Sequence, residues 1–131
     1  MLQQPIELIL MRQLAGYLTV PIFVVDSVGN LLFYNEAAEA ILGYRYEATG
    51  EMPLEEWGTI FSPMDELGVP LEPGDLPLAI ALRQQRPVKG AFRLRGLDDV
   101  WRSIEILAFP LEGQGSRRVG AAAIFWERTD Q

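Results

Sequence analysis

Residues 21–44 constrain the fold more than any other segment, because they predict a β-hairpin that leads directly into a short helix. Residues 23–25 and 31–34 are rich in β-branched and aromatic side chains, which favour strands. The polar segment between them reverses the chain, and Gly29 and Asn30 are residue types that can adopt the positive φ angles of tight turns. We therefore expect two antiparallel strands at the start of a sheet.

The helix that follows this hairpin has a suitable residue at each end. Asn35 can accept a hydrogen bond from one of the free N–H groups at the start of a helix. Gly43 can end the helix in the left-handed conformation, which costs glycine little. We therefore expect a short helix between these two residues.

Further helices are expected on both sides of this unit. Residues 5–18 predict one helix, with a proline at its first position, where the missing N–H would be unpaired in any case. Two short helical pieces are expected within 45–71, the clearer one at 54–61, and prolines break longer order there. Another helix is expected to begin at Asp75, a good N-cap residue type, and to stop at Pro87.

The last third of the chain predicts three strands, at residues 88–95, 100–109 and 119–127. Strands grouped at both ends of a chain, with helices between them, indicate an α+β fold. We expect one five-stranded antiparallel sheet covered by helices on one face, with an N-terminal flanking helix. The expected parts are a flanking or dimerisation helix at 1–18 and a single domain at 19–131.

Composition and charge exclude several classes of site. The chain has 131 residues, of which 49% are hydrophobic, so it can bury a core. It contains no cysteine and no histidine, which excludes disulfides, thiolate or imidazole metal ligands and His-ligated haem. No metal site is expected. The net charge of −7 opposes binding to phosphate backbones, so no direct nucleic-acid partner is expected.

The hydropathy pattern bears on location. No apolar run approaches the length that spans a membrane, and no secretion signal is visible after Met1. The absence of cysteine fits a reducing compartment. We therefore expect a cytoplasmic protein with no membrane partner.

The hairpin and helix at 21–44 resemble the start of a PAS domain, a sensor module of signalling proteins. The common PAS pattern is a strand ending in Asp, a Gly turn, a strand ending in Asn, and a helix ending in Leu-Gly-Tyr. Residues 78–82, 101–110 and 120–125 resemble its later helix and strands. The closing Glu-Arg-Thr at 127–129 is similar to the Asp-x-Thr end of many PAS domains, with Glu in place of Asp.

This resemblance implies a sensory and dimerisation module of a cytoplasmic signal-transduction protein, such as a two-component system or a transcription regulator. The implied partners are a second copy of the chain and an output domain or partner signalling protein. The chain would be either an excised sensor or a stand-alone adaptor. A ligand or partner would act by shifting the packing of the sheet, and with it the helix ending at Leu18 or the exit at Thr129.

Missing residue types restrict the cofactors that such a domain could hold. The covalent flavin chemistry of light-sensing LOV relatives requires a cysteine and is excluded. Phe125 lies, by alignment with their motif, where those relatives use a Gln to hydrogen-bond flavin, and Phe cannot do so. Non-covalent flavin is therefore disfavoured as well, and no cofactor is assigned.

The strand residues predicted to face the helices are almost wholly apolar. Two interpretations are open. One is a filled core in a ligand-free protein-interaction module. The other is a pocket for a small apolar or aromatic ligand, with Tyr34 or Trp57 as its polar group and with volume left by Ala121 and Ala123. The candidate pocket residues are Phe23, Val25, Tyr34, Leu42, Trp57, Phe61, Phe92, Ile104, Ile106 and Phe125.

The helix expected at 5–18 is apolar around more than one face. Either it lies across the sheet of its own domain, or its second side is buried against a partner chain, which the PAS resemblance favours. On the outer face of the sheet, Leu107, Phe109, Leu111 and Trp126 form an apolar surface for this helix to cover. The candidate dimer-interface residues are Ile6, Ile9, Leu10, Leu14, Tyr17 and Trp126.

The carboxylates do not form a convincing catalytic pair. Glu55 and Glu56 are adjacent, so they point apart on a helix, and Asp65 and Glu66 lie in a similarly polar segment. We therefore expect no enzymatic activity and no catalytic residue. The remote alternative, a small pocket enzyme, requires a buried carboxylate, and no candidate pocket residue is acidic.

Overall fold

A computed structural model describes residues 6–113, 115 and 117–128, and a five-stranded antiparallel sheet with the strand order β2-β1-β5-β4-β3 forms its centre. The strands are β1 (Ile22–Asp26), β2 (Leu31–Tyr34), β3 (Val88–Arg95), β4 (Trp101–Glu112) and β5 (Arg118–Glu127). The helices are α1 (Ile6–Tyr17), α2 (Glu36–Leu42), α3 (Tyr46–Thr49), α4 (Leu54–Ile60), the 3₁₀ turn η1 (Pro73–Asp75) and α5 (Pro77–Gln84). The expected α+β class and five-stranded antiparallel sheet are confirmed.

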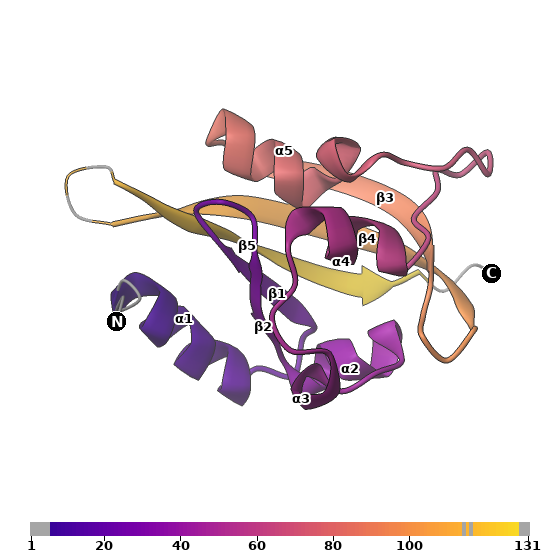
Figure 1. The fold of residues 1–131 in the computed structure, drawn as a ribbon, viewed down its shortest axis with the longest axis horizontal. Helices are drawn as coiled ribbons and strands as arrows, with labels where there is room; N and C mark the ends of the chain where they lie inside the picture. The colour runs from indigo at the N-terminus through magenta and orange to yellow at the C-terminus, as the bar shows by residue number, and fades with distance from the viewer. Residues whose placement is uncertain (1–5, 114, 116, 129–131) are drawn as a thin grey trace.

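Helices lie on both faces of the sheet, and alternating strand residues build one core on each face (Figure 1). Val25 and Phe125 belong to the larger core, beneath α2, α4 and α5. Val24 and Ala122 belong to the smaller core, beneath α1. The N-terminal helix therefore packs on the sheet of its own domain. None of the described helices is long and apolar enough to cross a membrane.

The turn between β1 and β2 is organised by an aspartate. The Oδ1 atom of Asp26 accepts hydrogen bonds from the backbone N–H groups of Val28, at 3.1 Å, and Asn30, at 2.9 Å. Gly29 has a φ of +93°, as expected, but Asn30 does not adopt a positive φ. Because Asp26 already binds the backbone and side chain of Asn30, the turn needs one left-handed residue rather than two.

Both predicted caps of α2 are confirmed. The side chain of Asn35 accepts a hydrogen bond from the backbone N–H of Ala38 at 3.1 Å. Gly43 is left-handed, with a φ of +76°, and its N–H donates to the carbonyl oxygen of Glu39 at 2.9 Å. Local signals were sufficient here because each cap acts within four residues.

The prediction that Asp75 caps the next helix is wrong. Asp75 ends η1, and Leu76 is the N-cap of α5, with no side-chain cap. The reason is Pro77: its ring keeps the preceding residue out of the helical region, and Leu76 accordingly has a ψ of 143°. The helix therefore cannot begin before Pro77. The helix ends at Gln84 because Gln85 adopts the left-handed conformation. It therefore stops before Pro87, the residue that was expected to end it.

Strands β4 and β5 are longer than predicted. The two strands are paired as far as Glu112 and Arg118, whereas the predicted strands ended at residue 109 and began at residue 119. Pro110 lies inside β4, past Ala108, the last β4 residue paired with β3. Its missing N–H therefore costs no ladder hydrogen bond on that side.

A matched pair of glycine substitutions tests how closely α2 packs on the turn between β3 and β4. A Cβ atom at Gly43 would lie 2.6 Å from Oδ1 and 2.7 Å from the backbone nitrogen of Asp98, whereas a Cβ at Gly68, whose φ is +86°, meets nothing within 4 Å. We expect Gly43→Ala to lower the free energy of unfolding by about 3 kcal/mol, and Gly68→Ala by about 1 kcal/mol. Urea denaturation measures both, and equal losses would contradict the close packing.

Candidate functional site

A small cavity lies in the larger core, between the sheet and the helices, with a volume of about 60 Å³. Its walls come from the strands on one side and from α2, α4 and α5 on the other. Eight of the ten candidate pocket residues line it, namely Phe23, Leu42, Trp57, Phe61, Phe92, Ile104, Ile106 and Phe125. Most of the residues chosen from strand alternation and helix position therefore lie together around this cavity.

Six further residues of the cavity wall were not among the candidates: Pro63, Leu76, Pro77, Leu78, Leu94 and Ala123. The position of Leu94 was signalled by its alternation with Phe92 along β3. The two prolines and Leu76 carry no such periodicity, because they lie in or beside irregular segments. Their place in the wall depends on tertiary packing.

The cavity is much smaller than a typical ligand site. Pockets for small molecules enclose about 300–1,000 Å³, so 60 Å³ leaves room for a few heavy atoms. Every lining residue is apolar apart from the indole N–H of Trp57, and apolar cavities remain dry. In this conformation the core is close to filled.

The two residues considered as polar groups of a pocket both use their polar atoms within the protein. The indole Nε1–H of Trp57 donates to the carbonyl oxygen of Gly29 at 2.8 Å. Tyr34 does not line the cavity, although it is fully buried and its ring stacks on Phe23. Val25 is likewise buried in this core without lining the cavity.

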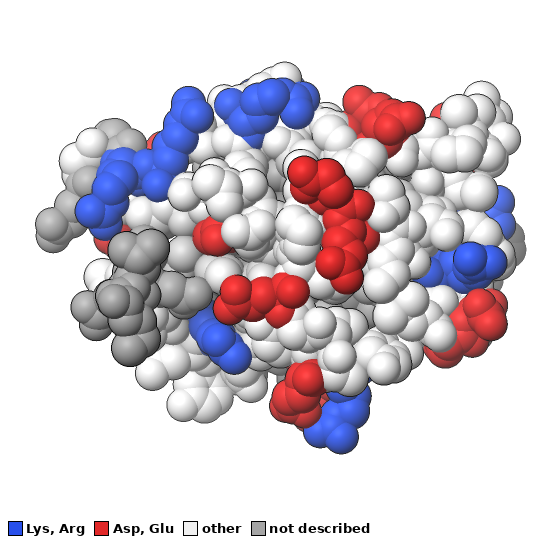
Figure 2. Space-filling model, in the orientation of Figure 1, with Lys and Arg blue, Asp and Glu red and all other residues white. Residues whose placement is uncertain are grey.

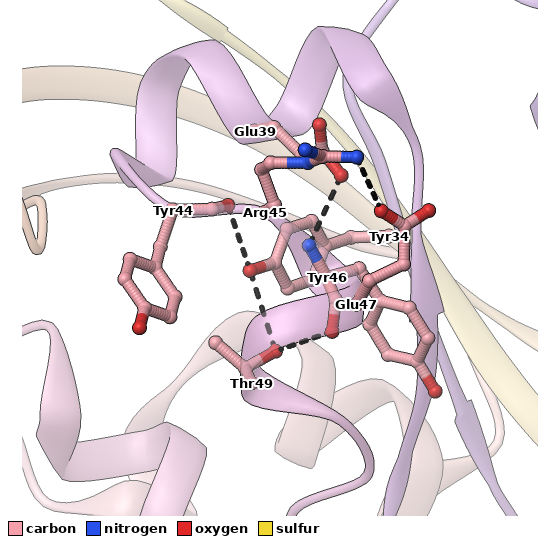
Figure 3. Close-up of polar contacts among 7 residues, drawn as sticks. All are labelled: Tyr34, Glu39, Tyr44, Arg45, Tyr46, Glu47 and Thr49. Carbon is pink, nitrogen blue, oxygen red and sulfur yellow. Dashed lines mark hydrogen bonds and ion pairs between the residues drawn. The ribbon is translucent and has the colours of Figure 1, made fainter.

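The hydroxyl of Tyr34 points toward the connection between α2 and α3 (Figure 3). It donates to the carbonyl oxygen of Tyr44 at 2.9 Å and lies 3.4 Å from Oγ1 of Thr49. Glu39, on α2, accepts a hydrogen bond from the backbone N–H of Tyr46 at 3.0 Å. These contacts fix α3 against α2 and leave the Tyr34 hydroxyl bonded to the protein.

Helix α1 has two apolar faces. Leu8 and Ala15, 2% and 0% exposed, pack on the sheet beside Val24. The guanidinium of Arg12 lies 4.9 Å from the ring centre of Phe33, which attaches the side of the helix to β2. The candidate interface residues on α1 are all exposed: Ile6 (64%), Ile9 (39%), Leu10 (56%), Leu14 (50%) and Tyr17 (85%).

The outer face of the sheet is covered in part. Phe109 and Leu111 pack against the core beneath α1, as the apolar pattern predicted. Leu107 is half-buried, and Trp126 remains 39% exposed. The cover that α1 provides therefore does not extend over Trp126.

The acidic residues examined for catalysis are set apart from the cavity. Glu55, Glu56 and Glu66 are exposed, and Oδ1 of Asp65 accepts two backbone hydrogen bonds in its own turn. Figure 2 shows acidic side chains grouped on the face that carries α4. Within the described part of the chain, no carboxylate lines the cavity and no group of three acidic residues could hold a metal ion.

Comparison with solved structures identifies the fold. No protein-family model and no curated protein sequence matches the chain. The PAS domain of a protein from Colwellia psychrerythraea aligns with 93% of this chain and 97% of its own, at 23% identity and a TM-score of 0.65. The PAS domain of Bordetella pertussis BvgS aligns over 95% and 88%, at 18% identity and a TM-score of 0.64.

A LOV protein from Rhodobacter sphaeroides is also similar, at 15% identity and a TM-score of 0.72, over 94% of this chain and 68% of its own. At these identities the likeness concerns the fold. The chain has the PAS fold, as the resemblance of residues 21–44 predicted.

The burial of Tyr34 predicts a dependence of stability on pH. Burial, the largest effect, raises the pKa of Tyr34 above its ordinary value of 10.0. The folded state therefore holds the phenol proton more tightly than the unfolded state, so this contribution is complete below pH 10.0 and declines as the pH rises toward the raised pKa. Urea denaturation between neutral and strongly alkaline pH should show wild-type stability falling at the alkaline end.

Tyr34→Phe is the matched variant for this measurement. It should lose about 1–2 kcal/mol at neutral pH, because the carbonyl oxygen of Tyr44 loses its donor. Its decline at alkaline pH should be smaller than that of the wild type. A residual decline is expected, because burial also raises the pKa of Tyr46. Parallel pH profiles of the two proteins would contradict the role of the Tyr34 hydroxyl.

Proposed function

With the PAS fold as premise, we propose that the chain is a sensory and dimerisation module of a signal-transduction protein, and that α1 carries the dimer interface. The observation that carries this proposal is the second apolar face of α1. Its buried face already covers the sheet, so the exposed face has no role in the fold of a single chain. A second copy of the chain is the partner that such a face suits.

The spacing of the exposed residues supports helix-to-helix packing. Ile6, Leu10, Leu14 and Tyr17 follow each other at intervals of four, four and three residues, which places them in one stripe along the helix. The opposite stripe holds Leu8 and the other buried residues. In a two-fold dimer, the same stripe would pack against itself and remove these side chains from water.

Trp126 belongs to the proposed interface as a second contact. It is a large aromatic side chain, 39% exposed on the sheet face that α1 leaves uncovered. Tryptophan is enriched among the residues that dominate binding energy at interfaces. A partner's α1, lying beside the first, would extend the cover toward this residue.

A second candidate function is the binding of a small apolar or aromatic ligand in the core. It is favoured by the cavity wall, which is apolar apart from the indole N–H of Trp57, and by the small side chain of Ala123 within it. At about 60 Å³, the cavity must widen before most ligands can enter. The alternative, a ligand-free interaction module with a filled core, requires no such change.

The composition of the chain and the size of the cavity restrict the cofactors that it could hold. The absence of cysteine and histidine excludes covalent flavin chemistry and His-ligated haem. Non-covalent flavin is disfavoured, because the ring of Phe125 is part of the cavity wall and a flavin is far larger than the space available. We propose a cytoplasmic, non-enzymatic module that acts on an output domain or a partner signalling protein, with no direct nucleic-acid contact.

Charge substitutions in the exposed stripe test the dimer. Wild-type protein should sediment as a dimer at micromolar concentration, and the double variant Leu10→Glu/Leu14→Glu should be monomeric, with a dissociation constant raised about a hundredfold or more. Leu67→Glu is the control, because Leu67 is 89% exposed in a loop outside α1. The proposal fails if the wild type is a monomer, or if the double variant still dimerises.

Native mass spectrometry of protein purified from its own host tests the ligand. A bound molecule at one per chain, released on denaturation, would establish a pocket and give its chemical class. Ala123→Val should then abolish the extra mass, because the larger side chain would occupy part of the cavity. Protein of the expected mass alone, together with a variant that is more stable by about 1 kcal/mol, would favour the filled-core interaction module.

A further inference from the structure

Asn35 is the buried polar residue of the described chain, with 2% of its surface exposed. Its side-chain oxygen accepts two hydrogen bonds. One comes from the backbone N–H of Ile22, at 3.0 Å, at the start of β1. The other comes from the N–H of Ala38, at 3.1 Å, in the first turn of α2. This half of the amide holds the start of α2 to the start of β1.

The side-chain nitrogen of Asn35 faces the other way, toward the end of α1. It lies 3.1 Å from the carbonyl oxygen of Ala15, 3.4 Å from that of Leu18 and 2.9 Å from that of Val20. Ala15 is in the last turn of α1, where its carbonyl oxygen also accepts from the backbone N–H of Leu18 at 3.3 Å. Leu18 and Val20 follow the end of the helix. The side-chain nitrogen of Asn35 donates to carbonyl groups of the last turn and of the segment after it, so one side chain joins the exit of α1 to the entry of α2.

The far end of α2 is attached to the cavity and to the sheet. Leu42 lines the cavity, and its carbonyl oxygen accepts from the backbone N–H of Leu97 at 2.8 Å. The carbonyl oxygen of Ile41 accepts from Nη1 of Arg102, also at 2.8 Å. With only seven residues, α2 is short enough to move as one body, so a displacement at Leu42 is transmitted to its capped end.

We infer that Asn35 couples the core to the proposed dimer interface, so that a change in packing around the cavity alters the docking of α1 through α2. This inference concerns the regulation of that interface and therefore rests on the proposed function. Asn35 acts as a positioning residue: it touches neither the cavity nor the exposed stripe. The coupling runs in both directions, so dimerisation through α1 also restrains α2.

Asn35→Asp separates the two halves of the amide. An aspartate retains an oxygen that can accept from Ile22 and Ala38, and aspartate is a good N-cap. It has no donor for the carbonyl groups of Ala15, Leu18 and Val20, and its second oxygen would face them. The variant therefore breaks the attachment of α1 while leaving α2 capped.

Hydrogen exchange of backbone amides in full-length protein gives the readout. In Asn35→Asp, the amides of α1 should exchange about tenfold faster or more, and those of α2 and β5 should be unchanged. Sedimentation should show a weaker dimer. Unchanged exchange in α1 overturns the inference. Equal acceleration in α1, α2 and β5 also overturns it, because Asn35 would then serve general stability alone.

A second pair of variants keeps Asn35 intact. Leu42 and Leu94 are both 3% exposed and both line the cavity, but Leu42 is on α2 and Leu94 is on β3. We expect Leu42→Ala to accelerate exchange in α1 about tenfold more than Leu94→Ala does, at comparable loss of global stability. Equal effects of the two truncations on α1 would overturn the coupling.

The outcomes for the interface and for the coupling are distinct. If the wild type is a monomer, the proposed dimer fails, while the exchange measurements still decide whether Asn35 and α2 control the docking of α1. If the wild type is a dimer and Asn35→Asp dimerises equally well with an unchanged α1, the interface stands and the coupling fails.

Discussion

The burial of the central strand β5 on both faces by helices of the same chain is the constraint on which the rest of the structure depends. Ala121, Ala122 and Ala123 are 0–1% exposed and alternate between the two cores. Their small side chains allow α1 to approach one face and the remaining helices the other. A strand that is apolar on both sides requires two covering layers, so α1 is part of the hydrophobic structure of the domain.

The sequence predicted those features whose signals are local. The caps of α2 act within four residues, and strand alternation identified the apolar residues that surround the cavity. The start of α5 was mispredicted because Pro77 outweighs the capping preference of Asp75. The volume of the cavity and the hydrogen-bond partner of the Tyr34 hydroxyl could not be predicted, because both depend on how α2, α3 and α4 pack on the sheet.

Asn35 illustrates how a local signal can conceal a tertiary role. Its capping function was evident from the sequence, and serine or aspartate would serve equally well for that purpose. Its contacts to Ala15, Leu18 and Val20 reach back 15–20 residues and require an amide donor. The requirement for asparagine at this position therefore comes from the junction with α1 and not from the cap.

Among the described residues that line the cavity, Trp57 has the only polar side-chain group, and the pairing of that group has a consequence for ligand selectivity. Because the Trp57 N–H already donates to the carbonyl oxygen of Gly29, a bound molecule would meet no free polar side chain that could hydrogen-bond to its functional groups. Selection would rest on shape and size, where one methylene group distinguishes two molecules by about 1–3 kcal/mol. Such a site separates close homologues of a hydrocarbon series by tenfold to roughly two-hundredfold, and it rejects polar analogues through their cost of desolvation.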